Sequence, residues 1–303
     1  MKTSLDHLPE GKQRELAFVV QAIRDGFAFA IARRTMPALR GGNLLKIILF
    51  GSYARGDWVE DPVGRYFSDY DLLVVVDREE LTDVPEFWAK TEERLLDELA
   101  SGQALRTPVS LIYHSLDDVN EKLRLGRYFF MDIVREGILL FEEPGFPFVE
   151  PQPLSSAEAL RETQDYFEEW FESARGFLDT AKYAAAQGRL KEAAFQLHQA
   201  TERFYHCLLL VRTLYSPKTH NLNQLRQLTE DFEPRLKVVW PRETKFERRC
   251  YELLREAYVK ARYSREYRIT GEQLDWLSGR VELLQRIVRE VSEERIAMLA
   301  DAA

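Results

Sequence analysis

The chain has 303 residues, of which 45% are hydrophobic and 30% charged, which is the composition of an ordinary globular protein with about two domains. The formal charge of -8 argues against a broad phosphate-coating surface, and no uncharged apolar run reaches the ~18 residues of a membrane span. The first twenty residues lack the basic-then-apolar layout of a secretion signal, so we expect a cytoplasmic protein that binds neither membrane nor duplex nucleic acid.

The first half of the chain alternates between helical and extended patterns. Continuous Leu, Ile and Val runs of strand length between helices predict a mixed sheet with helices packed on it. We therefore expect an α/β (α+β) domain at residues 1–143. Its helices are predicted at about 13–34 and 84–100, its strands at 44–51, 69–77 and 107–114, and a further amphipathic stretch at 117–136 precedes the apolar 137–143.

The second half is helical throughout and follows a proline-rich linker at 144–154, whose prolines cannot continue a helix or a central strand. Residues 155–303 are predicted to form an all-α bundle with helices at about 155–187, 190–214, 221–232, 244–265 and 271–300. The letters SSAE at the start of this bundle indicate a capping box. Cys207 and Cys250 lie in apolar helical patterns, which favours reduced, buried thiols.

Two polar motifs stand at the ends of apolar strands in the first half. Gly51 and Ser52 follow one strand, where a tight turn can hold a phosphate because glycine lets the chain come close to an anion. Asp69 and Asp71 open the next strand two residues apart, so both carboxylates point to one face and can share Mg²⁺. Together these residues predict a metal-dependent phosphate site of the kind that nucleotidyl transfer requires.

Each motif alone also occurs as a plain β-turn or an Asx-capped strand start, but together they favour the functional interpretation. The letters GSYARGD and SDYDLLVVV resemble the signature of the DNA polymerase β-like nucleotidyltransferases, particularly the minimal prokaryotic branch and the kanamycin nucleotidyltransferase type, over about residues 40–143. The resemblance implies that Gly51 and Ser52 contact the triphosphate, that Asp69 and Asp71 bind Mg²⁺, and that Arg55 supports the phosphates or the loop. It also makes ATP the default donor.

Two features depart from that family's pattern. The segment at 57–67 is longer than the spacer usual in that family. We therefore expect a lid or a contact surface at the mouth of the site. The family often has a third carboxylate on a neighbouring strand, but the position in phase here is Ser110. His114 at the end of that strand is an alternative base, although strand-end histidines are usually solvated. The remaining carboxylates near the motifs are better explained as caps or surface charges: Glu60, Asp61, Asp117 and Asp118.

The helical half resembles the HEPN domain over about residues 155–295, through the order LHQATE, KTHNL and ARYSREY. Many HEPN proteins are dimeric RNases that use an Arg followed after four to six residues by a His. No arginine in this chain has a histidine at that spacing, so RNase activity is disfavoured. Nucleotide binding is the role implied for members without that histidine.

Two groups of side chains in the helical half are candidates for binding. A tyrosine and arginine cluster could stack on bases and grip phosphates, or form a solvated helix end. Its members are Tyr258, Arg262, Tyr263, Arg265, Tyr267 and Arg268. His198, Glu202 and His206 lie one turn apart on one helix face. A metal stripe is less favoured than a polar core stripe there, because positions two turns apart are separated by ~12 Å.

We therefore expect an Mg²⁺-dependent nucleotidyltransferase that moves a nucleoside monophosphate, AMP by resemblance, from an NTP to a hydroxyl of an unidentified small molecule or protein. The expected catalytic residues are Asp69, Asp71 and Ser52, and the expected nucleotide-binding residues are Gly51, Ser52, Arg55, Arg262 and Tyr263. The alternative is a nucleotide-binding regulatory protein with an impaired transferase site, descended from a toxin and antitoxin pair. A homodimer through the helical half is also expected, because the aromatic-rich segments YFEEWFESARGFL and FYHCLLLVRTLY carry more apolar surface than one small bundle buries.

Overall fold

The computed structural model describes every residue of the chain except 33, 35–38, 40, 62–65 and 218. The described residues pack into two compact units, Met1–Pro153 and Leu154–Ala303. Each unit has its own buried core, so each is described by itself.

The first unit is built on a four-stranded sheet in the order β5-β4-β1-β6. β4 pairs in parallel with β5, whereas β1 pairs antiparallel with both β4 and β6, so the sheet is mixed, as predicted. The predicted strands lie within two residues of the observed ones, which are β1 (Leu44–Phe50), β4 (Tyr70–Val76), β5 (Val109–Ser115) and β6 (Ile138–Glu142).

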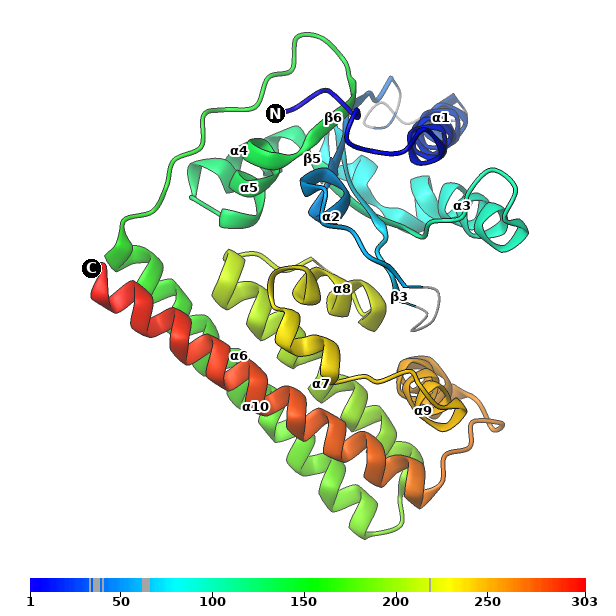
Figure 1. Cartoon of the computed structure of the whole chain (residues 1–303), viewed down its shortest axis with the longest axis vertical. Helices are drawn as coiled ribbons and strands as arrows, with labels where there is room; N and C mark the ends of the chain where they lie inside the picture. The colour runs from blue at the N-terminus through cyan, green and yellow to red at the C-terminus, as the bar shows by residue number, and fades with distance from the viewer. Residues whose placement is uncertain (33, 35–38, 40, 62–65, 218) are drawn as a thin grey trace. The chain divides into compact units, whose positions relative to one another are not determined.

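Helices cover both faces of this sheet (Figure 1). On one face lie α1 (Glu10–Ala32) and α3 (Ala89–Ser101), and on the other lie α4 (Leu116–Arg124) and α5 (Tyr128–Glu136). Every residue of β1 and β4 is buried in consequence, which explains why their sequences are continuous apolar runs.

Three predicted boundaries differ from the structure. The first helix ends at Ala32 rather than 34, and residue 33 lies outside the described residues. The helix predicted at 84–100 opens with a π-helical turn, η2 (Val84–Trp88), after the 3₁₀ turn η1 (Glu79–Thr82). The amphipathic stretch at 117–136 is broken into α4 and α5, because the glycine between them, Gly126, has the left-handed φ of 63°.

The long spacer at 57–67 forms a small antiparallel ribbon of two short strands, β2 (Glu60–Asp61) and β3 (Tyr66–Phe67). The tip of the spacer, 62–65, lies outside the described residues. The role of the spacer as a lid or contact surface stays a prediction.

The second unit is all-α, as predicted. Its long helices lie side by side (Figure 1): α6 (Ser156–Ala186), α7 (Leu190–Thr213) and α10 (Gly271–Asp301). Ser155 and Glu158 form the predicted capping box at the start of α6. The shorter elements are α8 (Leu222–Phe232), the 3₁₀ turn η3 (Pro234–Val238), α9 (Lys245–Glu256) and the π-helical η4 (Ala257–Ala261), so the helix predicted at 244–265 changes form after Glu256.

Helix α7 lies at the centre of the second unit and is buried on most of its surface. Cys207 of α7 and Cys250 of α9 are buried and free, which confirms the prediction of reduced thiols. None of the described helices is long and apolar enough to cross a membrane.

Candidate functional site

The glycine-serine turn follows β1 directly. Gly51 has φ of 71°, in the left-handed region that glycine adopts without strain, and it opens the short helix α2 (Gly51–Arg55). Ser52 is only 4% exposed, and its Oγ has no hydrogen-bond partner within the described part of the chain. A buried hydroxyl in this state calls for an explanation, and an oxygen of a bound phosphate would supply the missing partner.

The sheet register brings the aspartate motif beside this turn. Asp71 of β4 lies opposite Phe50, the residue that precedes Gly51. Its side chain is 1% exposed, whereas Asp69 just before the strand is partly buried. The two motifs that the sequence separates by seventeen residues therefore meet at one end of the sheet, because β1 and β4 run antiparallel and the end of one strand meets the start of the other.

The neighbouring strand offers no third carboxylate at this level. Ser110 of β5 is the direct partner of Asp71, as the strand phase predicted. Among the residues that the structure describes, no group of three His, Cys, Asp or Glu side chains is placed to hold a metal ion. Asp69 and Asp71 carry hard carboxylate oxygens of the kind that Mg²⁺ prefers.

His114 lies too far along β5 to serve as a base beside Asp71. It is level with Val75, four residues beyond Ser110, which corresponds to about 13 Å along the strand. Its Nδ1 is 2.6 Å from Oδ2 of Asp118, and this hydrogen bond, opposed by burial, lowers the pKa of Asp118. Asp118 also pairs with Lys122. His114 and Asp118 therefore form a local hydrogen-bonded pair where β5 leads into α4.

Arg55 closes α2 next to the turn. Its Nε is 3.3 Å from Oδ2 of Asp57, and its side chain is 32% exposed. Burial raises the pKa of Asp132 on α5, and the charges of Arg135 and, more weakly, Arg55 oppose this shift. Glu60 of the nearby ribbon is paired with Lys12, which makes it a structural charge, and the side chain of Asp61 lies outside the described part.

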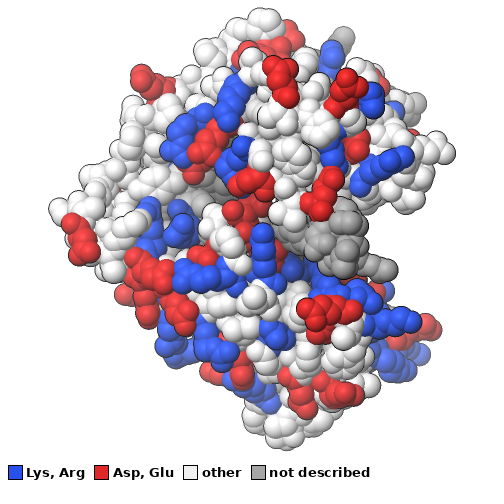
Figure 2. Space-filling view, viewed as in Figure 1, with Lys and Arg blue, Asp and Glu red and all other residues white. Residues whose placement is uncertain are grey.

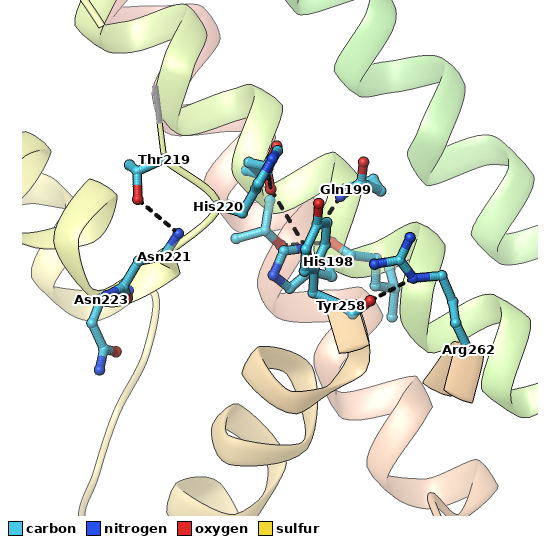
Figure 3. A network of polar contacts seen from close by, with 11 residues as sticks. His198, Gln199, Thr219, His220, Asn221, Asn223, Tyr258 and Arg262 are labelled. Atoms are coloured by element: carbon cyan, nitrogen blue, oxygen red, sulfur yellow. Dashed lines mark hydrogen bonds and ion pairs between the residues drawn. The ribbon is translucent and has the colours of Figure 1, made fainter. Parts of the chain in front are cut away.

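In the second unit, a polar network surrounds Tyr258 (Figure 3). Nδ1 of His220 lies 3.1 Å from both carboxylate oxygens of Glu202, and the His220 ring stacks on Tyr258 at 4.6 Å. His198, which is 1% exposed, lies against the same tyrosine ring at 5.2 Å. His198 and Glu202 therefore belong to a shared polar network rather than to an isolated helix stripe, and Lys218 of the KTHNL motif lies outside the described residues.

Arg262 is held in place by aromatic rings. Its guanidinium lies 4.5 Å from the centre of the Tyr258 ring and 5.0 Å from those of Phe195 and Tyr263, and its Nε donates to the Tyr258 carbonyl. Tyr263 is 76% exposed. One member of the expected cluster is different: Tyr267 is 3% exposed and donates its hydroxyl to the Leu253 carbonyl, so it is a core residue and cannot stack on a base.

The buried histidines of α7 predict a pH-dependent stability. Burial, helped by nearby positive charge, lowers the pKa of His198 to about 3 and of His206 to about 4, so both stay neutral in the folded chain at pH 5. An unfolded histidine takes up a proton near pH 6.5. Between pH 7 and pH 5 this protonation stabilises the unfolded state relative to the folded state by about 2 kcal/mol per histidine. Urea unfolding of the second unit should therefore show a loss of up to about 4 kcal/mol over this range, which is the sum for the two histidines alone.

Glu202 works in the opposite direction, since burial raises its pKa and its protonated form favours the folded state at the acid end. His198→Gln should remove about half of the pH-dependent loss, because a neutral amide takes up no proton. His114→Gln, in the other unit, is the control. An unfolding free energy of the second unit that is equal at pH 7 and pH 5 would contradict the expectation.

Comparison with known families identifies both units. A model of the nucleotidyltransferase domain matches residues 33–128, and a model of the HEPN domain matches residues 167–293. The chain therefore joins an N-terminal nucleotidyltransferase domain to a C-terminal HEPN domain, which confirms the fusion expected from the sequence. A search of curated proteins found no match. Domains of the first kind generally transfer nucleoside monophosphates from an NTP with the help of a divalent metal.

The first fifteen residues make contacts with the candidate site that no sequence motif predicts. His7 and Lys12 both reach the residues around the glycine-serine turn, Tyr53 above all. His7 and Lys12 belong to no recognisable motif, so their sequence positions alone do not predict these contacts. Only the tertiary structure brings them together with a segment more than forty residues away.

Proposed function

We propose that the N-terminal domain transfers a nucleoside monophosphate, AMP by default, from an NTP to a hydroxyl of a small molecule or protein. One observation supports this most: the register of β1 and β4 sets the buried Asp71 beside the glycine-serine turn, inside the matched domain. In the reaction, the acceptor hydroxyl gives up its proton to solvent and its oxygen bonds to the α-phosphorus, while the bond from that phosphorus to the oxygen bridging to the β-phosphorus breaks and pyrophosphate leaves.

Each site residue has a distinct role in this proposal. Gly51 and Ser52 hold the triphosphate, the first by letting the backbone approach and the second by donating its unpaired hydroxyl. Arg55 supports the phosphates with its charge, and Asp69 and Asp71 would hold Mg²⁺. When bound, Mg²⁺ neutralises the triphosphate and the developing charge on pyrophosphate.

Incubation of the purified chain with labelled NTPs and Mg²⁺ tests this function. We expect label to pass to an acceptor, with pyrophosphate released in equal amount, and mass spectrometry reveals whether the chain modifies itself. Omission of the metal should stop the transfer. No transfer from any of the four NTPs to small-molecule hydroxyls or to protein would reject the enzyme.

A second candidate function is a nucleotide-binding regulatory protein with an impaired transferase site, derived from a toxin and antitoxin pair. The specific observation in its favour is Ser110, which stands opposite Asp71 where the family often has a carboxylate. This candidate predicts Mg²⁺-dependent nucleotide binding without turnover, so binding and transfer measured on the same sample separate the two functions.

The HEPN domain is proposed to bind a nucleotide or another phosphate-bearing ligand through Arg262 and Tyr263. The rings around Arg262 hold its guanidinium in place while the exposed Tyr263 ring offers a stacking surface. In a chain that also carries Asp69→Asn and Asp71→Asn, Arg262→Ala should weaken ATP binding about tenfold, the loss of one charged hydrogen-bond donor pair. Calorimetry measures the affinity.

Lys260→Ala is the control for this prediction, because Lys260 has the same charge on the same segment and pairs with Glu256. Neither variant, nor the parent, should cleave single-stranded RNA. RNA cleavage that disappears in Arg262→Ala would overturn the prediction and would point to His220 or His198 as the missing base.

A homodimer through the helical half is proposed as well. The segment FYHCLLLVRTLY is mostly buried inside its own unit, whereas the apolar side chains of Tyr183, Val238, Val259 and Met298 are more than half exposed. Light scattering of the full chain should give twice the 35.5 kDa mass of one chain. A single-chain mass at micromolar concentration would count against the dimer.

A cytoplasmic location and the absence of duplex nucleic acid among the partners also belong to this proposal. On the face shown in Figure 2, Lys and Arg side chains intermingle with Asp and Glu, and the chain carries a net charge of -8. Such a surface favours small or protein substrates over the phosphate backbone of a duplex.

A further inference from the structure

Residues 2–15, here named the N-terminal strap, are tied to the sheet at two places. Near one end, Lys2 forms a parallel bridge with Ile138 at the start of β6. Its backbone N–H donates to the carbonyl oxygen of Gly137 at 3.0 Å. At the other end, Nζ of Lys12 donates to Oγ1 of Thr107 at 2.7 Å, and Glu15 accepts the backbone N–H of Thr107 at 3.1 Å. The strap therefore has fixed ends on β6 and just before β5.

Between these ends, His7 bonds to the backbone of the glycine-serine turn. Its Nε2 lies 2.8 Å from the carbonyl oxygen of Tyr53 in α2, and it is the donor because a carbonyl can only accept. The backbone N–H groups of Gly56 and Asp57 both bond to the carbonyl of Ser52 instead. The Tyr53 carbonyl is thus one of the groups that a helix end leaves without an internal partner, and His7 supplies it.

An aromatic stack extends this contact to the aspartate motif. Trp58 stacks on Tyr53 at 5.3 Å, and Tyr53 packs on Tyr70 at 4.5 Å. Nζ of Lys12 lies 5.6 Å and 5.9 Å from the two tyrosine ring centres, and His7 meets Trp58 edge-on at 6.4 Å. Since Tyr53 follows Ser52 and Tyr70 lies between the two aspartates, the strap contacts both halves of the candidate site through one stack.

We infer that His7 is a positioning residue for nucleotidyl transfer, which fixes the Gly51–Ser52 turn against Asp71 before the nucleotide arrives. This inference rests on the proposed function. The strap lies outside residues 33–128, the part that the nucleotidyltransferase model matches. A turn held in its working geometry needs no rearrangement when the triphosphate binds, which lowers the cost of binding and of the transition state.

Two substitutions in the full chain separate the hydrogen bond from the packing. His7→Phe keeps a ring beside Trp58 and removes the N–H, whereas His7→Gln keeps a donor of similar reach and removes the ring. Hydrogen exchange of the peptide that covers Gly51–Asp57, measured without nucleotide, should accelerate about fivefold in His7→Phe and stay near the wild-type rate in His7→Gln, in line with the loss of one hydrogen bond.

In the transfer assay, His7→Phe should raise the KM for the NTP about fivefold and lower kcat, and His7→Gln should restore most of both. His114→Phe, at the other end of the sheet, is the control and should change neither the exchange of this peptide nor the KM. A purely structural role would lower thermal stability without this separation between the Phe and Gln variants.

Unchanged exchange at Gly51–Asp57 in His7→Phe overturns the inference, whatever the activity. If His7→Phe does not fold, Lys12→Met, which removes the cation over Tyr53 and Tyr70, should give the same local acceleration, and its absence overturns the inference equally. Accelerated exchange in a chain whose wild type neither binds nor uses an NTP would leave the strap contact in place but reject both its catalytic role and the proposed function. The two failures are thereby distinguishable.

Discussion

Asp69→Asn combined with Asp71→Asn should abolish Mg²⁺-dependent NTP binding and reduce nucleotidyl transfer by more than about a hundredfold. The two carboxylates are the only metal ligands proposed for the site, and asparagine lacks the negative charge that a hard divalent cation requires. Calorimetry with ATP in the presence and absence of Mg²⁺ measures the effect.

The fold should survive this double substitution. Asp71 is 1% exposed, and asparagine has nearly the same shape without a charge to desolvate. Asp77→Asn is the matched control, because Asp77 follows the other end of the same strand and pairs with Arg78. If the affinity for Mg²⁺-ATP is unchanged in the double variant, Asp69 and Asp71 do not bind the metal.

Arg226→Met is expected to be the most destabilising single change in the HEPN domain. Arg226 and Glu230 lie one turn apart on α8, are 4% and 1% exposed, and are joined by an ion pair of 2.5 Å. Burial, the largest single influence, works against the charge of Arg226, but Glu230 together with Tyr251 and Tyr205 outweighs it and raises the pKa of Arg226 above its usual value. Removal of the arginine leaves a buried carboxylate without its partner, at a cost of about 3–5 kcal/mol.

Urea unfolding followed by tryptophan fluorescence measures this loss. Trp240 lies beside the substituted residue, since Arg226 donates to its carbonyl. The double variant Arg226→Met with Glu230→Leu should recover most of the stability, since neither charge is then buried alone. Lys182→Met is the control: its partner Glu282 lies 2.8 Å away, both side chains are over 40% exposed, and the expected change is within about 1 kcal/mol. If Arg226→Met lowers the free energy of unfolding by less than about 1 kcal/mol, the prediction is wrong.

The buried ion pair and the His7 contact are two features that local sequence patterns do not predict. Arg226 and Glu230 have the spacing of an ordinary exposed helix pair, and only the packing of α8 decides that they are buried. His7 and Tyr53 are separated by 46 positions. Local patterns carry no information about which distant segment covers a helix face or a free carbonyl, so neither contact could be predicted.

The sequence by itself determined the two-part organisation, the mixed sheet, the helical half and the identity of the two motifs. Continuous apolar runs, helical periodicity and glycine or aspartate at strand ends are local features, and they follow from the geometry of single strands and helices. The tertiary structure alone decided how the motifs meet. The antiparallel register sets Asp71 beside the turn, the parallel register sets Ser110 opposite Asp71 and His114 far along the strand, and packing buries Tyr267 but leaves Tyr263 exposed. These outcomes depend on contacts between distant segments, and such contacts are fixed only when the whole domain folds.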